Sequence, residues 1–200
     1  MYHRFEENKY PSTNIKIADF KSHINIIKNS DFEFISYKQF IEHVNKKNNT
    51  KKIFLTIDDG FSSFYRNAWP ILKKEKIPFV IFVNTESVGS SGYMSWEELK
   101  EISEFDFAHI GNHSHSHGYL ADKSDDEIRK DIKTSMKIFE KNLNHKTEFF
   151  AYPFGEYKNS YKKIVEDLGF NYGFGQHSGV IDSTKDKFEL PRFPINEKYG

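Results

Sequence analysis

Residues 53–61, Ile-Phe-Leu-Thr-Ile-Asp-Asp-Gly-Phe, decide how the rest of this chain is interpreted. Five residues suited to a buried strand are followed directly by two adjacent aspartates and a glycine. Two charged side chains therefore lie where an apolar strand ends. Proteins built from alternating strands and helices place their reactive side chains at such strand ends. Asp59-Gly60 is also a common hairpin signal. However, Ser62, Ser63 and the apolar positions that follow predict a capped amphipathic helix in place of a returning strand.

The length and composition limit the number of domains, the kinds of partner and the types of metal ligand. With 200 residues, 37% of them hydrophobic and 16% aromatic, the chain is long enough for one domain with a substantial core. Lys plus Arg and Asp plus Glu each number 29, so no overall field attracts nucleic acid or an anionic membrane. The chain has no cysteine, which excludes disulfides and thiolate ligands. Any metal must therefore be held by nitrogen and oxygen.

The two ends of the sequence carry no targeting signal. No apolar run approaches the roughly 20 residues of a membrane span, and the N-terminus has no signal-peptide core. The chain starts abruptly at Met1-Tyr2-His3 and stops at Gly200, soon after a candidate strand. This leaves open that it is a portion of a longer protein, truncated at both ends, and that a secretion signal lies in the missing part.

Strand and helix patterns alternate along the chain. Helices are expected after Ser36 and after the capping boxes Ser95–Glu98 and Ser124–Glu127, and residues 45–52 are expected to be a polar, solvated connection. The expected strands cover residues 32–35, 53–57, 79–83, 105–110, 148–152, 172–174 and 190–193. This alternation predicts parallel strands with helical crossovers. The pattern alone is compatible with a barrel and with an open doubly wound sheet.

A histidine-rich stretch follows the strand expected at 105–110. His113-Ser-His-Ser-His117 holds three of the chain's nine histidines. Histidines at i and i+4 on a helical turn can face one point, and those at i and i+2 share one side of an extended segment. Two neutral imidazoles and one carboxylate form a facial triad that leaves positions open for water and substrate. The stretch therefore predicts a metal site, with a merely polar loop as the plainer alternative. The other histidines expected to be surface or satisfied packing residues are His23, His43, His109 and His145.

Two further stretches offer chemistry at strand ends. Residues 149–155, Phe-Phe-Ala-Tyr-Pro-Phe-Gly, end in a turn whose backbone N–H groups can point into a cleft, and an ordinary turn explains them equally well. Residues 173–179, Gly-Phe-Gly-Gln-His-Ser-Gly, lack the serine midway between glycines that a hydrolase elbow needs, so a serine nucleophile is rejected. His177 in that loop is a candidate general acid or base.

Taken in order, three of these stretches resemble the motifs of the polysaccharide deacetylases, the NodB-homology or carbohydrate esterase 4 family. Residues 56–60 resemble T-F-D-D-G, residues 113–117 resemble H-[ST]-x-x-H, and residues 152–155 resemble the end of R-x-P-Y-G. The third stretch departs from the pattern, because Ala151 stands where the family usually has Arg and Phe154 where it has Tyr. Tyr2-His3-Arg4 and residues 175–179 further resemble the branch that includes the poly-β-1,6-N-acetylglucosamine deacetylases.

The resemblance implies a metal site and a general base. Asp59, His113 and His117 would hold a divalent metal, usually Zn²⁺, with Co²⁺ or Ni²⁺ as alternatives. Asp58 would be the base that removes a proton from the attacking water, whose pKa the metal lowers toward roughly 7. Adjacent residues at a strand end point in different directions, which agrees with separate roles for the two aspartates.

The remaining roles follow less directly from the motifs. The backbone N–H of Phe154 is expected to hold the tetrahedral oxyanion together with the metal. Many family members carry the proton donor for the leaving amine in a late L-x-H motif; here His177 is the first candidate, ahead of His3. Arg192, in Leu190-Pro-Arg-Phe-Pro194, is the candidate replacement for the motif-three Arg that usually orients the base.

The resemblance implies a distorted (β/α) barrel of about seven parallel strands that forms one catalytic domain over residues 1–200, with His3 at the end of the first strand. It implies a metal-dependent hydrolase that removes N-acetyl groups from a polysaccharide containing N-acetylglucosamine, releasing acetate and leaving a free amine. The expected location is extracytoplasmic, in the periplasm or at the cell surface. Neither the polymer nor the oligomeric state is determined by the sequence.

Two rival functions remain open at this point. One keeps the metal but hydrolyses a small amide or cyclic ureide, with His113 and His115 as an amidohydrolase-type pair. The other is a catalytically inactive glycan-binding module, which the altered third motif favours. If the protein is a deacetylase or an inactive module that binds a glycan, exposed aromatic residues can stack on the sugar. Packing in the core or at the rim is the more ordinary role of such residues. The candidates are Tyr93, Trp96 and Tyr157.

Overall fold

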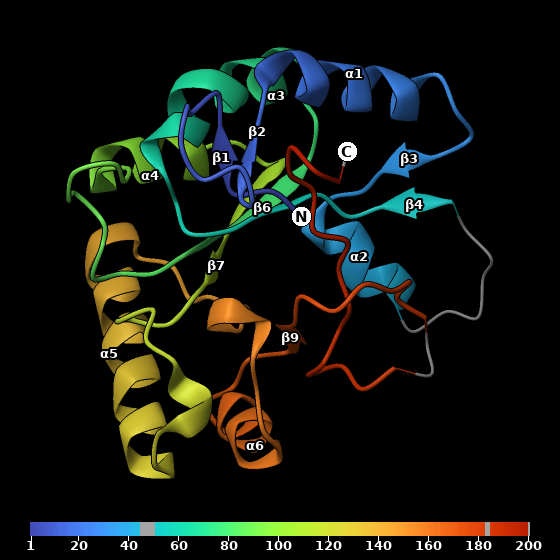
Figure 1. Ribbon diagram of the computed structural model, residues 1–200. Coiled ribbons are helices and arrows are strands. Elements are labelled where there is room, and N and C mark those ends of the chain that lie inside the picture. The colour runs from blue at the N-terminus through green and yellow to red at the C-terminus, as the bar shows by residue number, and fades with distance from the viewer. Residues whose placement is uncertain (45–50, 183–184, 200) are drawn as a thin grey trace.

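A parallel sheet forms the centre of the molecule. The computed structural model describes residues 1–44, 51–182 and 185–199, so most of the connection expected at 45–52 lies outside the described residues. Neighbouring strands of the sheet follow one another in the sequence, and helices cover the connections between them (Figure 1). This confirms the predicted helical crossovers. The strand order is β5 (Thr56–Ile57), β6 (Phe79–Val83), β7 (Ala108–Asn112), β8 (Phe149–Ala151) and β9 (Tyr172–Phe174).

Segments near the two ends of the chain extend this sheet at both edges. Tyr2 pairs in parallel beside β5, and Leu190 pairs in parallel beside β9. The two edge segments also meet, because the Ile195 N–H donates a hydrogen bond to the Met1 carbonyl at 3.0 Å. In Figure 1 the red segment that precedes the C-terminus accordingly passes close to the N-terminus. Seven parallel segments therefore surround the core, in agreement with the predicted distorted (β/α) barrel.

The strand expected at residues 53–57 is divided in the structure. β4 (Lys52–Ile53) pairs with β3 (Glu33–Phe34) in a separate two-stranded sheet, whereas β5 belongs to the central sheet. The Ile53 carbonyl accepts a hydrogen bond from the N–H of Ile35, the residue after β3. The Leu55 carbonyl accepts one from the N–H of Val80 in β6, so the segment changes partners midway. A third sheet joins β1 (Arg4–Phe5) to β2 (Asn14–Ile15).

The helices begin close to their predicted start signals. Ser95 and Ser124 each accept a hydrogen bond from the backbone N–H three residues later, and the glutamate at that position bonds back, which confirms both capping boxes. The segment after β5 starts as a π-helix, residues 64–68, and continues as an α-helix. The α-helices are α1 (Ile17–Lys28), α2 (Tyr37–Val44), α3 (Trp69–Glu75), α4 (Trp96–Ser103), α5 (Asp125–Leu143) and α6 (Asn159–Asp167).

Two predicted strands are shifted or reduced. β7 begins at Ala108 and not at residue 105, because Phe105 and Phe107 pack their rings against Trp69 of α3 before the strand starts. The strand expected at 190–193 is reduced to the bridge at Leu190. Proline cannot donate to a ladder, and a proline follows at position 191.

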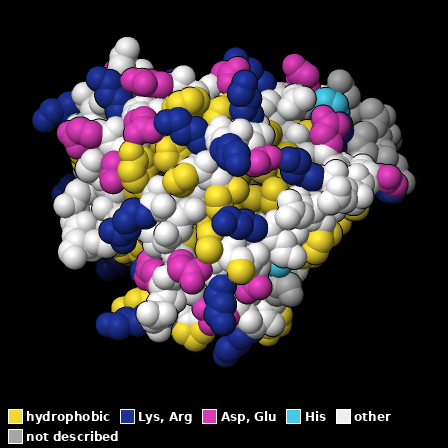
Figure 2. Space-filling view, turned by 90° about the horizontal axis from the view of Figure 1, so that it is seen from above, with side chains coloured by type: hydrophobic (Ala, Val, Ile, Leu, Met, Phe, Trp, Pro, Cys, Tyr) yellow, Lys and Arg dark blue, Asp and Glu magenta, His cyan; other side chains and the backbone are white. Residues whose placement is uncertain are grey.

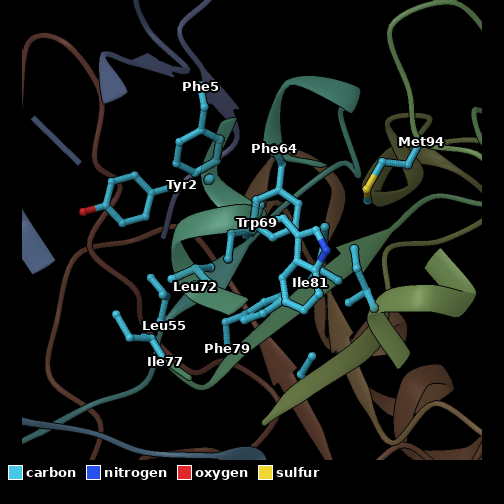
Figure 3. Packing of buried hydrophobic residues seen from close by; sticks show 14 of the residues in the cluster. Tyr2, Phe5, Leu55, Phe64, Trp69, Leu72, Ile77, Phe79, Ile81 and Met94 are labelled. Carbon is cyan, nitrogen blue, oxygen red and sulfur yellow. The ribbon is translucent and has the colours of Figure 1, made fainter. Parts of the chain in front are cut away.

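The core is rich in aromatic residues and lies between the sheet and the helices. All five residues of β6 are buried, as expected for a strand covered on both faces. Figure 3 shows part of the largest cluster, in which Phe64 and Trp69 from the helical segment pack toward Phe79 and Ile81 of β6. No helix among the described residues is long and apolar enough to cross a membrane. On the face shown in Figure 2, acidic and basic side chains are intermixed around hydrophobic ones, and neither sign of charge gathers.

Candidate active site

Buried polar side chains gather at the carboxyl ends of the parallel segments. His3 follows the first segment, Asp58 and Asp59 follow β5, His113 follows β7, and Arg192 follows the bridge at Leu190. The side chain of Asp59 is 14% exposed, and each of the other four residues is at most 8% exposed. Parallel strands bring these residues to one edge although they span nearly the whole chain.

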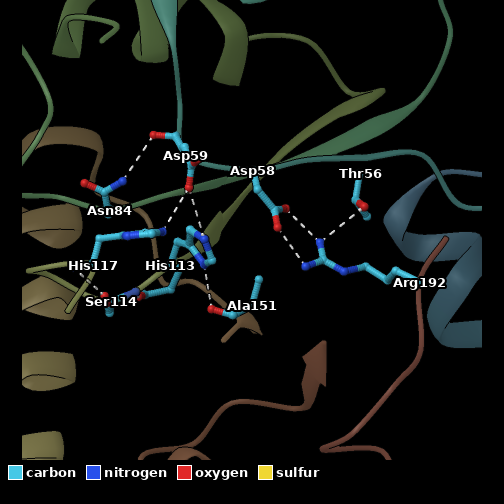
Figure 4. Close-up of polar contacts among 10 residues, drawn as sticks. Thr56, Asp58, Asp59, Asn84, His113, Ser114, His117, Ala151 and Arg192 are labelled. Atoms are coloured by element: carbon cyan, nitrogen blue, oxygen red, sulfur yellow. Dashed lines mark hydrogen bonds and ion pairs between the residues drawn. The ribbon is translucent and has the colours of Figure 1, made fainter. Parts of the chain in front are cut away.

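Asp59, His113 and His117 converge on a common point (Figure 4). The Oδ1 atom of Asp59 lies 3.3 Å from Nε2 of His113 and 3.1 Å from Nε2 of His117. All three candidate ligand atoms lie within 4.8 Å of one another. The structure thus brings together the three residues that the sequence predicted to share a metal.

The backbone after β5 separates the two adjacent carboxylates. Asp59 has φ 75° and Gly60 has φ 77°, so the chain passes through two consecutive left-handed residues. Aspartate tolerates this conformation better than most residues, and such strain concentrates at functional sites. Asn84, just after β6, donates its side-chain amide to the Asp59 carbonyl at 3.3 Å. The Asp59 carboxylate therefore points toward the histidines while Asp58 points away from them (Figure 4).

The donor atoms of this cluster fit a divalent cation. Oδ1 of Asp59 is buried and accepts no hydrogen bond of acceptable geometry from the described residues. Nδ1 of His113 lies 2.7 Å from the Ala151 carbonyl, to which it must donate, so in the neutral form of the ring the Nε2 lone pair is available to a cation. A buried carboxylate oxygen between two imidazole nitrogens is a donor set typical of Zn²⁺ and related ions.

The same three residues shift one another's protonation. Burial alone would raise the pKa of Asp59, but His113 and His117 outweigh it and hold that pKa well below its usual value. Burial alone would lower the pKa of His113, but Asp59 and Asp58 outweigh it and raise that pKa. The neighbouring groups thus favour an ionised Asp59 carboxylate.

The loop that carries the histidines is held by its own polar groups and by α5. The His117 N–H donates to Oγ of Ser114 at 3.0 Å. Asp131 of α5 accepts two backbone hydrogen bonds, from the His115 N–H at 2.7 Å and from the Ser116 N–H at 3.0 Å. Asp131 is not predictable from the sequence, because an acidic residue on a helix carries no local signal that it contacts a distant loop.

His115 takes no part in the convergence. Its Nδ1 lies 2.9 Å from the hydroxyl of Thr85, which follows β6. The cluster of possible metal ligands found among the described residues consists of Asp59, His113 and His117. The ligand pair of the small-amide rival, His113 with His115, therefore does not form in this structure.

Asp58 makes a two-pronged ion pair with Arg192. Nη1 and Nη2 of Arg192 each lie 2.7 Å from a different oxygen of the Asp58 carboxylate, and Nη1 also donates to the Thr56 hydroxyl at 3.3 Å (Figure 4). The Arg192 Nε donates to the Gly175 carbonyl at 2.8 Å. Burial alone would raise the pKa of Asp58, but Arg192 and His113 outweigh it and lower that pKa. Asp58 is thus a fixed, ionised carboxylate beside the triad.

The two candidate proton donors lie in different surroundings. His3 is buried, and its electrostatic partners include Asp59, Asp58 and His113. Burial lowers the pKa of His3 despite the opposing charges of the two aspartates. His177 is exposed, its ring lies 6.4 Å from that of Tyr157, and its backbone carbonyl accepts a hydrogen bond from the Arg192 N–H. The structure therefore brings His3 to the site and leaves the His177 side chain exposed.

Phe154 lies in the turn after β8, next to a metal ligand. Its backbone has φ 60° and ψ 5°, and its ring lies 4.9 Å from the ring of His117. Among the hydrogen bonds of the described residues, none uses the Phe154 N–H as a donor. The N–H is therefore free to bind an oxygen of a ligand.

These features define a class of protein. The sequence profile described as polysaccharide deacetylase matches residues 45–173. This match covers more than half of the chain and includes the Asp-Asp pair, the histidine loop and the turn after β8. The chain therefore belongs to the polysaccharide deacetylase family.

The chain is also similar to individual deacetylases. The chain is 28% identical over 194 residues to the poly-β-1,6-N-acetyl-D-glucosamine N-deacetylase of Staphylococcus aureus (strain MSSA476), an alignment that covers 90% of this chain and 67% of the relative. IcaB from Ammonifex degensii superimposes with a TM-score of 0.88 at 25% identity, over 98% of this chain and 90% of that one. The Streptococcus pyogenes deacetylase PplD, solved with acetate, has a TM-score of 0.87 at 24% identity, over 98% of this chain and 91% of that one. The (β/α) barrel is thus the fold of this chain.

Proposed function

We propose that this protein is a metal-dependent hydrolase that removes N-acetyl groups from a polysaccharide containing N-acetylglucosamine, releasing acetate and leaving a free amine. The observation that carries the proposal is the convergence of Asp59, His113 and His117 beside a separately held carboxylate, Asp58. Family membership and the similarity to poly-β-1,6-N-acetyl-D-glucosamine N-deacetylases support the choice of reaction and of polymer. Because we propose a glycan substrate that lies outside the membrane, we also propose an extracytoplasmic location for the protein.

In the proposed reaction, Asp59, His113 and His117 hold the metal and Asp58 is the general base. When bound, a divalent cation such as Zn²⁺ supplies Lewis acidity, which lowers the pKa of water and polarises the acetamide carbonyl. Asp58 takes the proton of the attacking water as the water oxygen adds to the carbonyl carbon. Although Arg192 engages both carboxylate oxygens, each keeps a further lone pair for this proton. Arg192 acts as the positioning residue for the base.

The Phe154 N–H is the proposed donor to the oxyanion. Charge develops on the former carbonyl oxygen as the tetrahedral species forms, and a fixed N–H in a dry site stabilises it. The support for this role is that Phe154 lies beside the His117 ring and that its N–H has no acceptor among the described residues. The side chain is not needed for this role, which accounts for phenylalanine in place of the family's usual tyrosine.

The leaving amine requires a proton donor, and we favour His3 over His177. The choice of His3 is supported by its burial near Asp58, Asp59 and His113, whereas the His177 side chain is exposed. As the C–N bond breaks, the donor transfers its proton to the nitrogen. His3→Gln should therefore lower kcat at least about 100-fold, and His177→Gln should leave it within about threefold. The reverse result would restore His177.

The proposed activity is tested by measuring acetate released from poly-β-1,6-N-acetylglucosamine, chitin oligomers and peptidoglycan, with Zn²⁺ or Co²⁺ supplied. His117→Ala should abolish release, and His115→Ala should retain most of it. Loss of activity in His115→Ala together with hydrolysis of small cyclic amides would favour the ureide-hydrolase rival. Polymer binding without acetate release from any of the three substrates would favour the inactive glycan-binding module.

A further inference from the structure

Two aromatic side chains remain about half exposed beside the metal-binding triad. Phe154 is 51% exposed and Tyr119 is 45% exposed, whereas most large apolar residues of this chain are buried. Their ring centroids are 5.8 Å apart, and the ring of Phe154 lies 4.9 Å from that of His117. The two residues come from separate segments, one after the histidine loop and one after β8. They form a continuous apolar surface at the edge of the candidate active site.

The backbone holds Phe154 in this position. A bulky residue in the left-handed region is a real outlier, and its cost is not recovered by burying the ring, which is half exposed. Pro153 restricts the turn from one side. On the other side, a Cβ atom at Gly155 would lie 2.5 Å from Cβ of Gln176, so the turn is packed closely against residue 176. The Phe154 ring is therefore presented to solvent by a rigid turn.

Other aromatic residues near strand ends do not share this property. Tyr93 packs against Phe61 with ring centroids 4.9 Å apart, and Tyr157 packs against Tyr152 at the same distance. Trp96 lies 5.9 Å from Phe139 of α5. All three are only partly exposed, so the packing role that the sequence analysis offered as their alternative describes them better than sugar stacking does.

We propose that Phe154 and Tyr119 form a shelf on which an N-acetylhexosamine ring stacks next to the metal-binding triad. This inference rests on the proposed function, because it assigns the residues that seat its glycan substrate. One face of a pyranose ring carries C–H groups that pack on an aromatic ring, while the hydroxyl groups at its edge bond to polar neighbours. Such a contact needs no charge on the substrate, in keeping with a chain of zero formal net charge.

Polar groups at the edge of the shelf complete the site. The exposed carboxylates of Glu156 and Asp122 are electrostatic neighbours of the Tyr119 phenol. The phenol can donate to a sugar hydroxyl, and the two carboxylates offer acceptors. The shelf thus combines an apolar face with hydrogen-bonding groups around it, which is the pattern expected of a sugar subsite.

The experiment compares Tyr119→Ala, Tyr119→Phe and Phe154→Tyr with the wild-type protein. Steady-state acetate release from β-1,6-linked N-acetylglucosamine oligomers gives KM and kcat. Their Kd is measured by calorimetry in an Asp58→Asn background, which cannot turn the oligomer over. We expect Tyr119→Ala to raise KM and Kd about tenfold, the size of one aromatic stacking contact. Phe154→Tyr should stay within about threefold of wild type because it keeps the ring. Tyr119→Phe keeps the ring but loses the phenol donor, so it should raise KM and Kd less than Tyr119→Ala does.

Two controls separate stacking from damage to the site. The Zn²⁺ affinity, measured by competition with a chromogenic chelator, should be unchanged in Tyr119→Ala, because Tyr119 is not one of the triad residues. Phe32→Ala removes an aromatic residue that is also 45% exposed but lies next to β3, which belongs to a separate two-stranded sheet and not to the central sheet that leads into Asp58; it should leave KM unchanged. Thermal unfolding of each variant verifies folding.

The outcomes distinguish this inference from the proposed function. If the wild-type protein releases acetate and Tyr119→Ala keeps the wild-type KM and Kd, the shelf is wrong and the proposed function stands. If the wild-type protein releases no acetate from any glycan, the proposed function fails, and the calorimetric Kd values still test the shelf. An equal rise in KM in Phe32→Ala would also overturn the assignment.

Discussion

Arg192 and Asp58 are 134 positions apart in the sequence, yet Nη1 and Nη2 of the arginine each lie 2.7 Å from an oxygen of the carboxylate. The pair is buried, with 4% and 0% of the two side chains exposed. Paired geometry of this kind holds a carboxylate in one orientation more firmly than a lysine could. The family usually supplies an arginine from motif three, where this chain has Ala151, and here the arginine comes from the far edge of the sheet.

We predict that Arg192→Ala destabilises the protein and removes activity. Loss of the guanidinium leaves Asp58 charged and unpaired in the interior, which costs about 3–5 kcal/mol. For a chain of this length, that corresponds to a fall in Tm of roughly 10 °C. Circular dichroism melts measure the change. Arg192→Lys keeps the charge but not the paired bonds, and we expect it to fold with kcat about 100-fold lower. Normal kcat in Arg192→Lys would show that the base needs no such positioning.

Metal binding should stabilise the wild-type protein but not a triad variant. A cation at 100 times its Kd contributes about 2.7 kcal/mol, which at this size raises Tm by about 5–10 °C. We expect this shift with Zn²⁺, its reversal by a chelator, and its absence in Asp59→Ala and His113→Ala. Asp58→Asn should keep the shift while losing acetate release. Loss of the shift in Asp58→Asn would indicate that both aspartates bind the metal.

Asp131 should control metal affinity through the backbone of the histidine loop. Asp131→Asn keeps the size of the side chain but replaces one acceptor oxygen with an NH₂ group, which opposes the N–H of His115 or Ser116. We expect Zn²⁺ affinity to fall about 10–100-fold, as measured by competition with a chromogenic chelator. Asp126→Asn, on an exposed position of the same helix, is the matched control and should keep wild-type affinity. Equal Zn²⁺ affinities in the two variants would show that Asp131 does not control metal binding.

His109 should make the protein sensitive to acid. Burial and the neighbouring His145 lower its pKa to about 3; its Nε2 has no partner among the described residues, and its ring stacks on Tyr37. The unfolded chain binds a proton near pH 6.5 that the folded protein does not bind until about pH 3. Stability is therefore complete above pH 6.5 and falls as the pH drops toward 3, by up to about 1.4 kcal/mol per pH unit.

Urea unfolding of His109→Phe checks this assignment. Between pH 7 and pH 5, we expect the wild-type protein to lose up to about 2 kcal/mol more stability than the variant. Parallel curves for the two proteins would mean that another group dominates the acid response. His109 also corrects one expectation from the sequence: it is a buried packing residue, but its second nitrogen is not satisfied.

The order of elements and both capping boxes follow from local sequence, and the resemblance to the family selected Asp59, His113 and His117 as the metal ligands. Apolar periodicity and capping depend on residues a few positions apart, and parallel strands necessarily bring their carboxyl ends to one edge. Asp59 follows β5 and His113 follows β7, the strands on either side of β6, so both residues lie at the same edge of the sheet. The turn at Asp59-Gly60 could be interpreted as a strand end and not as a hairpin because Ser62, Ser63 and the apolar positions after them predict a helix.

Only the tertiary structure decided which distant groups complete the site. Arg192 reaches Asp58 because the segment after β9 returns to the edge of the barrel beside Tyr2, and His3 is buried among the charges by the same closure. Asp131 and the Ala151 carbonyl contact the histidine loop across helix and strand packing. Such contacts depend on how whole elements pack, and no short-range pattern in the sequence records that packing.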